Sequence, residues 1–287
     1  QRIAAHLLWV ATHALDLGAM TVLFYAFRER ETILETLELV TGARLTPSFI
    51  RIGGLAADIP ATFLPRVAEF VADLPKRIDD YETLLTENII WKKRTQDIAS
   101  MSGEECINYG VTGPVLRAAG VYYDVRKAYP YSSYEDFDFE IPLGKKGDVY
   151  DRYLVRLKEM RQSNRIVKQA MEKLPEGPVI ADDAPLVIPP AKEKVGKDIA
   201  ALIRHFKIMQ DGFQTPRGEV YASIESSKGE LGFYIVSDGP NKPFRMKISP
   251  PSFINLGALP KMVEGQMVAD VGAAIGSIDI VLGEIDR

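Results

Sequence analysis

Hydrophobic residues run almost without interruption through the first part of the chain and then alternate with charged ones. Residues 7–27 read LLWVATHALDLGAMTVLFYAF, whereas residues 27–40, FRERETILETLELV, place apolar side chains at steps of three and four. Together they predict one helix over residues 3–40, which ends before Gly42. Because the first half is apolar on nearly all sides, we expect it at the centre of a helical bundle.

The same periodicity predicts two more long helices. One covers residues 62–85, after a loop at residues 41–60 that contains Gly and Pro. The other, at residues 147–174, is the clearest helix of the chain and is on the order of 40 Å long. Its periodic positions fall at steps of three and four, with Asn164 as the one polar member among Val149, Tyr153, Leu157, Met160, Asn164, Val167, Met171 and Leu174. A short helix is expected after Ser102, because Glu105 completes a capping-box pattern.

The pattern changes from helices to strands late in the chain. After a helix at residues 195–209, the runs GEVYASIES, GELGFYIVSDG and PFRMKISP are separated by turn residues. They predict an antiparallel meander with one face packed on the helices. A final helix of small residues, VADVGAAIGSIDIVLG, carries Gly272 and Gly276, whose spacing of four allows another backbone to approach closely.

These elements predict an α+β fold, a helical bundle core with a small C-terminal antiparallel sheet. We expect a mainly helical core at residues 1–175 and a Pro-rich connection at residues 176–194. Residues 195–287 carry the last helices, the meander and a C-terminal segment, all within one structural domain with the core. The chain begins without a helix cap or an initiator Met, which suggests a fragment of a longer protein.

Composition narrows the functional classes. A net charge of −4 over 287 residues argues against a general nucleic-acid binder. With Cys106 as the single cysteine, neither an internal disulfide nor a metal site built on several thiolates is possible. The nucleotide-binding and hydrolase motifs G-x-G-x-x-G, P-loop, H-E-x-x-H and G-x-S-x-G are also absent. We therefore expect no cofactor bound by this chain alone.

Asp16 is the unusual residue of the apolar stretch. An Asp at the centre of an isolated membrane span costs roughly 2.5–3.5 kcal/mol, so a buried bundle helix is favoured over a span. His13 lies three residues away on the same helix face and could meet Asp16. Two interpretations follow: a satisfied core pair, or a carboxylate that orients an imidazole for proton donation.

Several long motifs identify a family. The chain resembles the large quinone-site subunit of respiratory complex I in the order THALDLGAMT, FYAFRERE, TGARL, IRIGG, LRAAGVYYDVRKAYPY, GDVYDRYLVRLKEMRQS, GELGFYIVSDG and IGSIDIVLGEIDR. That family is related to the large subunit of nickel–iron hydrogenases, whose fold the resemblance implies here. The hydrogenase metal needs two C-x-x-C pairs, which this chain lacks, so hydrogenase activity is excluded.

The resemblance implies a subunit of a proton-pumping NADH:quinone oxidoreductase that is not catalytic alone. Quinone would be the substrate, reduced beside the terminal iron–sulphur cluster of a neighbouring subunit and coupled to proton translocation. FMN, NADH and the clusters would belong to other subunits. The implied partners are that cluster-bearing subunit, other peripheral-arm subunits and membrane-arm subunits, with no nucleic acid. The implied location is peripheral, on the cytoplasmic side of the cell inner membrane.

The resemblance also assigns site residues. Asp16 would be the catalytic carboxylate, hydrogen-bonded in the family to a His that lies upstream of Gln1. The quinone cavity would be lined by Asp16, Asp279, Val281, Glu284, Asp286 and Arg287. Thr46 and Arg51 would face the cluster.

Thr46 is a departure from many members, which carry a His at this position. A Thr hydroxyl is uncharged across the physiological pH range, so we expect a cluster of lower and nearly pH-independent potential, suited to a quinone such as menaquinone. A redox titration with a strong pH slope would contradict this. Two alternatives stay open: a related quinone-reducing complex fed by ferredoxin or deazaflavin, and a non-catalytic scaffold.

Overall fold

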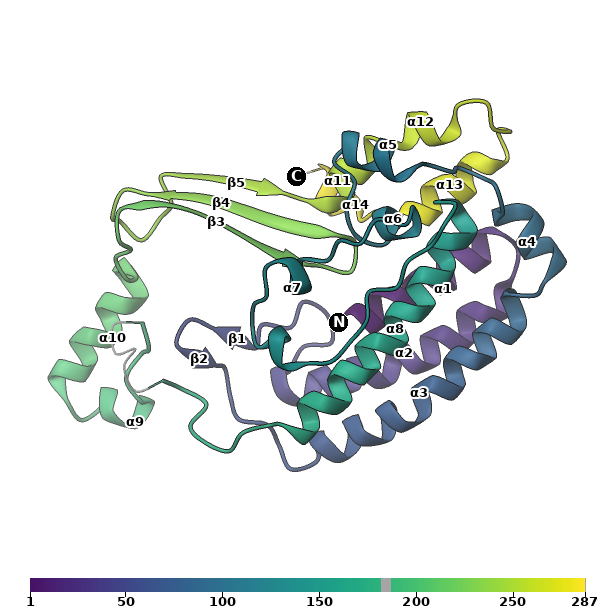
Figure 1. Ribbon diagram of the computed structural model, residues 1–287. Coiled ribbons are helices and arrows are strands. Elements are labelled where there is room, and N and C mark those ends of the chain that lie inside the picture. The colour runs from purple at the N-terminus through teal and green to yellow at the C-terminus, as the bar shows by residue number, and fades with distance from the viewer. Residues whose placement is uncertain (182–186, 287) are drawn as a thin grey trace.

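Four long helices form the core of the computed structural model, which describes residues 1–181 and 187–286 (Figure 1). They are α1 (Arg2–Asp16), α2 (Met20–Thr41), α3 (Phe63–Leu85) and α8 (Val149–Glu172). Helix α1 packs against both α2 and α8, and α3 packs against the same two helices. The side chains of Leu7, Val10, Ile78, Tyr81 and Leu157 are fully buried between them. The part of the apolar stretch in α1 therefore lies at the bundle centre, as predicted. The prediction is wrong for much of the part in α2, where Met20, Phe24 and Phe27 are 56%, 62% and 42% exposed.

The single helix predicted over residues 3–40 is wrong. The chain leaves the helical conformation at Gly18, whose φ of +92° suits a glycine, and reverses direction between α1 and α2. The two halves then pack against each other as a helical hairpin. The reversal lets the apolar residues of both halves share one core.

Short elements connect the bundle helices. The capping box at Ser102 and Glu105 is present, with Ser102 Oγ accepting from the Glu105 N–H at 3.2 Å. Part of the loop expected at residues 41–60 forms a small hairpin instead. The connecting elements are β1 (Ile50–Arg51), β2 (Gly54–Leu55), α4 (Ile89–Thr95), α5 (Gly103–Asn108), α6 (Gly113–Ala118), α7 (Val125–Ala128) and a 3-10 turn η1 (Tyr134–Asp136).

The predicted meander is confirmed. Strands β3 (Gly218–Glu225), β4 (Glu230–Ser237) and β5 (Arg245–Ser249) form an antiparallel sheet in the order β3-β4-β5, with Ile235 opposite both Val220 and Met246. The predicted packing of its apolar face on the helices is wrong over much of its length. Val220 is 56% and Met246 50% exposed, because the sheet projects away from the bundle (Figure 1).

The remaining helices flank the sheet at its two ends. Helices α9 (Lys192–Val195) and α10 (Ile199–Asp211) lie at the end far from the bundle (Figure 1). At the near end lie α11 (Pro251–Leu256), α12 (Leu259–Val263), α13 (Asp270–Ile278) and α14 (Leu282–Asp286). The architecture is α+β, as predicted. Of the Pro-rich connection, residues 182–186 lie outside the described residues.

Among the described helices, none is both long enough and apolar enough to cross a lipid bilayer.

Candidate functional site

Asp16 is exposed, which corrects the predicted buried pair with His13. It occupies the last position of α1, and within the described part of the chain its carboxylate forms no hydrogen bond or ion pair. His13 is the buried member, at 1% exposure. Its ring stacks on Trp9 at 5.0 Å between centroids and meets the edge of Trp91 at 5.6 Å. The spacing of three does not bring the two side chains together: His13 packs between Trp9 and Trp91 in the core, whereas Asp16 is exposed to solvent.

His13 is neutral in the folded protein. Burial, with Arg156 and Arg152 acting in the same direction, lowers its pKa to about 3. Within residues 1–181 and 187–286, neither ring nitrogen has a hydrogen-bond partner. His13 therefore acts here as a packed aromatic ring rather than as a charged proton donor.

Helix α13 crosses α1 at His13. A Cβ on Gly276 would lie 2.6 Å from His13 Nδ1, and Trp9 Nε1 donates to the Gly276 carbonyl at 2.6 Å. The predicted close approach is confirmed for Gly276. It is wrong for Gly272, where a Cβ would meet nothing within 4 Å. The crossing places the C-terminal end of α13 against the bundle.

Asp279 caps α13 and lies in a charged cluster. Its φ of +62° is left-handed, a conformation that Asp tolerates better than most residues. Its carboxylate forms an ion pair with the Lys228 ammonium, and the two side chains are 10% and 12% exposed. Burial raises the pKa of Asp279, while Lys228 and Arg156 oppose that rise.

Lys228 comes from the turn between β3 and β4, which is held by two other segments, residues 112–113 and α11. A Cβ on Gly113 would lie 2.5 Å from both the Lys228 carbonyl oxygen and Gly229 Cα. Asn255 Nδ2 donates to the same carbonyl at 3.2 Å, and the Glu230 N–H donates to Thr112 Oγ1 at 3.0 Å. The turn can approach this closely only because position 113 is glycine.

Two buried arginines of α8, Arg152 and Arg156, contact the last residues of α13, next to Asp279. Arg156 is 1% exposed, lies 4.2 Å from the Trp9 ring centroid, and donates to the Ile278 carbonyl at 3.4 Å. Arg152 donates to Ser277 Oγ and the Ala99 carbonyl, each at 2.7 Å. Within the described residues no carboxylate is hydrogen-bonded to either guanidinium. Positive charge is therefore in excess here.

A second buried network continues from Glu159 on the same helix. His6 Nε2 donates to Glu159 Oε2 at 2.8 Å, and Arg117 Nε donates to Glu159 Oε1 at 2.8 Å. Arg117 also bonds Glu225 at 2.9 Å, which links the bundle to β3. Burial lowers the pKa of His6 to about 4, against the opposing effect of Glu159. Arg117 and His6 hold the pKa of Glu159 well below its usual range despite burial.

Sequence periodicity missed these charges, although it contained a signal. Arg152, Arg156, Glu159 and Ser163 recur at steps of four, three and four, beside the apolar stripe of α8. All four are buried. On a long helix, only the face opposite the apolar stripe needs to be polar for contact with solvent. A second polar stripe directly beside the apolar one therefore indicates polar side chains that are buried.

The other predicted C-terminal residues follow Asp279 along the chain, and Glu284 is close enough to act electrostatically on Lys228. Val281 is 46% exposed, and Asp286 is exposed. Glu284 of α14 accepts a hydrogen bond from Ser252 Oγ of α11. Arg287 lies outside the described residues.

Thr46 and Arg51 lie in a different part of the molecule. Both are exposed, and Thr46 has a left-handed φ of +51°. Arg51 lines a cavity of about 840 Å³ between the β1–β2 hairpin and α10. Among the described residues, no interaction joins either side chain to Asp16 or Asp279.

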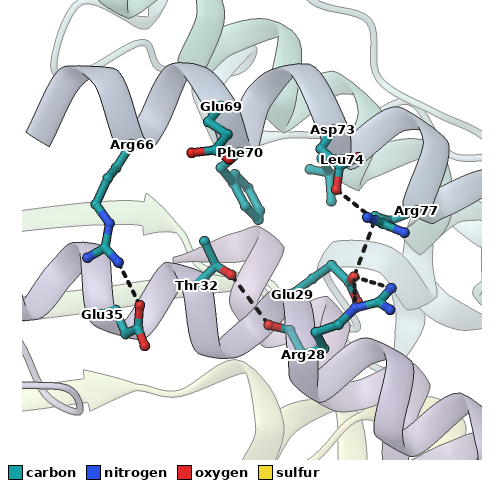
Figure 2. Close-up of a pocket in the computed structure, with 10 residues that line it drawn as sticks. All are labelled: Arg28, Glu29, Thr32, Glu35, Arg66, Glu69, Phe70, Asp73, Leu74 and Arg77. Carbon is teal, nitrogen blue, oxygen red and sulfur yellow. Dashed lines mark hydrogen bonds and ion pairs between the residues drawn. The ribbon is translucent and has the colours of Figure 1, made fainter.

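A groove between α2 and α3 contains none of the predicted site residues (Figure 2). Its volume is about 570 Å³. Its arginines are paired with carboxylates: Arg66 with Glu35 at 2.9 Å, Arg77 with Asp73 at 2.6 Å, and Arg28 with Glu29 at 2.6 Å. Two ion pairs cross the groove between α3 and α2, Arg66 with Glu35 and Arg77 with Glu29 at 3.5 Å, and the other two each lie within one helix. Elsewhere in the described chain, no group of three or more His, Cys, Asp or Glu side chains is placed to hold a metal ion.

Comparisons with known proteins agree on one family. Residues 16–287 match the family described as respiratory-chain NADH dehydrogenase, 49 Kd subunit. The D subunit of the NADH-quinone oxidoreductase of Trichlorobacter lovleyi is 56% identical over 286 residues, which cover 100% of this chain and 73% of the relative. The D subunit numbered 2 of Chloroflexus aurantiacus is 55% identical over 290 residues, covering 100% and 70%. The D subunit of Geobacter sulfurreducens is 53% identical over 286 residues, covering 100% and 73%.

Proposed function

Because the chain belongs to the family of 49 kDa, or D, subunits of NADH-quinone oxidoreductase, we propose that it forms the quinone-reduction cavity of that complex. Membership makes it a subunit of an oxidoreductase that contains further subunits. The observation that carries the proposal is the buried charged cluster of Asp279, Lys228 and Arg156 at the end of α13.

The surroundings of this cluster suit a quinone head group. A quinone presents an apolar ring with two carbonyl oxygens, which become hydroxyl groups when two electrons and two protons are added. Val281 and Leu282, two and three residues after Asp279, are 46% and 68% exposed and offer apolar contact for the ring. Lys228 offers a charged donor at its ion pair with Asp279. An apolar wall with few polar groups is the usual composition of a small-molecule site.

Asp16 keeps a role in this proposal as an exposed carboxylate. Its oxygens are available to an imidazole or another donor from outside the described residues, which it would orient for proton transfer. Glu284 and Asp286 belong to the frame of the cavity, and Val281 to its apolar lining.

The proposed partners follow from the exposed elements. Thr46 and Arg51 would face the neighbouring subunit that holds the terminal iron–sulphur cluster. FMN and NADH would be bound by other subunits of the peripheral arm. We place the assembly on the cytoplasmic side of the inner membrane, where contact with membrane-arm subunits couples quinone reduction to proton translocation.

Replacing Asp279 tests the cavity. We expect Asp279→Asn, in the full-length protein within its complex, to lower the kcat of NADH-driven quinone reduction or raise the quinone KM by about 10- to 150-fold, because loss of one charge-assisted contact costs about 1.5–3 kcal/mol. NADH oxidation by an artificial acceptor that bypasses the quinone should be unchanged.

Arg165→Gln is the matched control, because Arg165 lies on α8 in an exposed ion pair with Asp138. It should leave both activities unchanged. An assembled Asp279→Asn complex with normal quinone kinetics would contradict the proposed cavity.

A further inference from the structure

The cluster at the end of α13 holds two cations and one carboxylate in a largely buried place. Lys228 and Asp279 form the ion pair, and Arg156 of α8 is close enough to act electrostatically on both. Their side chains come from the β3–β4 turn, the α13 cap and the bundle. When these three groups are ionised, they carry a net charge of +1 between them, which is costly away from water and is offset only in part by Glu284 acting on Lys228 and Glu159 acting on Arg156.

Resting on the proposed function, we propose that Lys228 donates a proton from this cluster to the quinone cavity, and that Arg156 is a positioning residue whose fixed charge makes that proton easy to release.

The charges decide which group gives up its proton. A guanidinium keeps its proton more firmly than an ammonium, so Arg156 stays charged. Burial lowers the pKa of Lys228, and Arg156 lowers it further, while Asp279 and Glu284 of α14 oppose the change. Release of one proton from Lys228 leaves the Asp279 carboxylate balanced by Arg156, and the cluster becomes neutral.

The geometry holds Arg156 still and leaves Lys228 reachable. Arg156 is fixed over the Trp9 ring and against the Ile278 carbonyl. Lys228 keeps 12% of its side chain exposed, and its partner Asp279 lies two residues before Val281, which is 46% exposed. An ammonium at the margin of an apolar wall can pass its proton to a ligand on that wall and recover one from solvent.

Electrons and protons balance in this step. The quinone accepts two electrons from the iron–sulphur cluster of the neighbouring subunit, which NADH re-reduces through the complex. One N–H bond of the Lys228 ammonium breaks, and one O–H bond forms on a reduced quinone oxygen. The donor oriented by Asp16 supplies the second proton, and solvent re-protonates the Lys228 amine.

The pH dependence of quinone reduction, measured with the full-length protein within its complex, tests the proposal. The result that matters is the direction in which each variant shifts this pH dependence. Quinone reduction should fall on the alkaline side as Lys228 loses its proton. Arg156→Met removes the competing cation, so this alkaline limb should move to higher pH. Asp279→Asn removes the balancing anion, so in the residual activity the limb should move to lower pH, by about 1–3 pH units. Lys228→Met should lower kcat at least about 100-fold.

Arg165→Met, on the same helix, is the control and should leave the limb unmoved. Limbs that move in the same direction, or not at all, would overturn the proton role. If Asp279→Asn and Lys228→Met both leave quinone kcat and KM unchanged, the proposed cavity itself fails. If they impair quinone reduction without opposite limb shifts, only the proton role fails.

A measurement on the unmodified complex covers the case in which Arg156→Met does not assemble. Competitive acylation with acetic anhydride from pH 6 to 11, followed by mass spectrometry, reads the protonation of Lys228 directly. We expect a midpoint clearly below the value of about 10.4 for a free lysine side chain. A midpoint at or above that value would overturn the proposal.

Discussion

Individual residues set the geometry of the proposed site, and one of them is a glycine, which has no side chain. Gly276 lets α13 approach His13 and Trp9, and the ring of Trp9 in turn carries the Arg156 guanidinium. The position of Asp279, three residues after Gly276, therefore depends on the absence of one methyl group. His13 contributes shape rather than charge to this contact.

Gly276→Ala should destabilise the protein by about 1–3 kcal/mol, because the new Cβ overpacks a ring held between two tryptophans. Urea unfolding of the purified chain, followed by fluorescence of the buried Trp9 and Trp91, measures the loss. Gly272→Ala is the control on the same helix. With open space at that position, the substitution should be neutral or stabilise by up to about 1 kcal/mol. Equal effects at the two positions would contradict this account of the crossing.

At the scale of elements, the β3–β4 turn links the sheet to the bundle. It brings Lys228 to Asp279, and its backbone packs on the start of α6. The position of Lys228 is thus set by a backbone contact between Gly113 and Gly229, and not by strands β3 and β4 themselves. A small shift of the turn would separate the ion pair.

Gly113→Ala should displace this turn. Both Gly113 (φ +71°) and Gly110 (φ +70°) are left-handed, so alanine is strained equally at each. Only at position 113 does the Cβ meet backbone, at 2.5 Å, whereas at position 110 the nearest atom is 3.5 Å away. We expect Gly113→Ala to cost about 1–3 kcal/mol more than Gly110→Ala in urea unfolding. Similar losses would show that the close approach is unimportant.

At the scale of the whole molecule, a chain of buried charges joins the sheet to the bundle. It runs from His6 and Glu159 through Arg117 to Glu225. Such networks hold parts together only while each member keeps its charge state, because an unpaired buried charge is costly. Protonation of these groups at low pH should therefore weaken the packing of the sheet against the helical bundle.

Stability should fall as the pH drops from about 6.5 toward 4. The pKa of His6 is lowered to about 4 and that of His13 to about 3, so the unfolded chain binds more protons than the folded chain in this window. Each histidine contributes a slope of up to about 1.4 kcal/mol per pH unit. Below this window, protonation of Glu159 removes further stability, since its folded pKa is depressed.

Urea unfolding at several pH values measures this slope. His13→Leu removes one of the two titrating rings without breaking a hydrogen bond among the described residues, and should reduce the slope by about half. A slope that is unchanged in this variant would show that His13 does not titrate on unfolding in this window.

The sequence by itself determined the family, the fold class and the existence of the main helices and strands. Periods of 3.6 and 2 are local properties, so α8 and the β3–β5 meander could be predicted, as could the family from its long motifs. The break at Gly18 could not, because an apolar stretch is compatible with one long helix or with two helices packed together. Roles assigned to Asp16, Asp279 and the other site residues remain proposals.

Only the tertiary structure decided which charged groups meet. Lys228, Asp279 and Arg156 are separated by dozens of residues, and no local pattern relates them. Their proximity comes from two glycine contacts, at Gly276 and Gly113, that permit close backbone approach. Packing also left Asp16 exposed while it buried His13, since burial depends on what covers a helix face and not on the hydrophobicity of its neighbours in sequence.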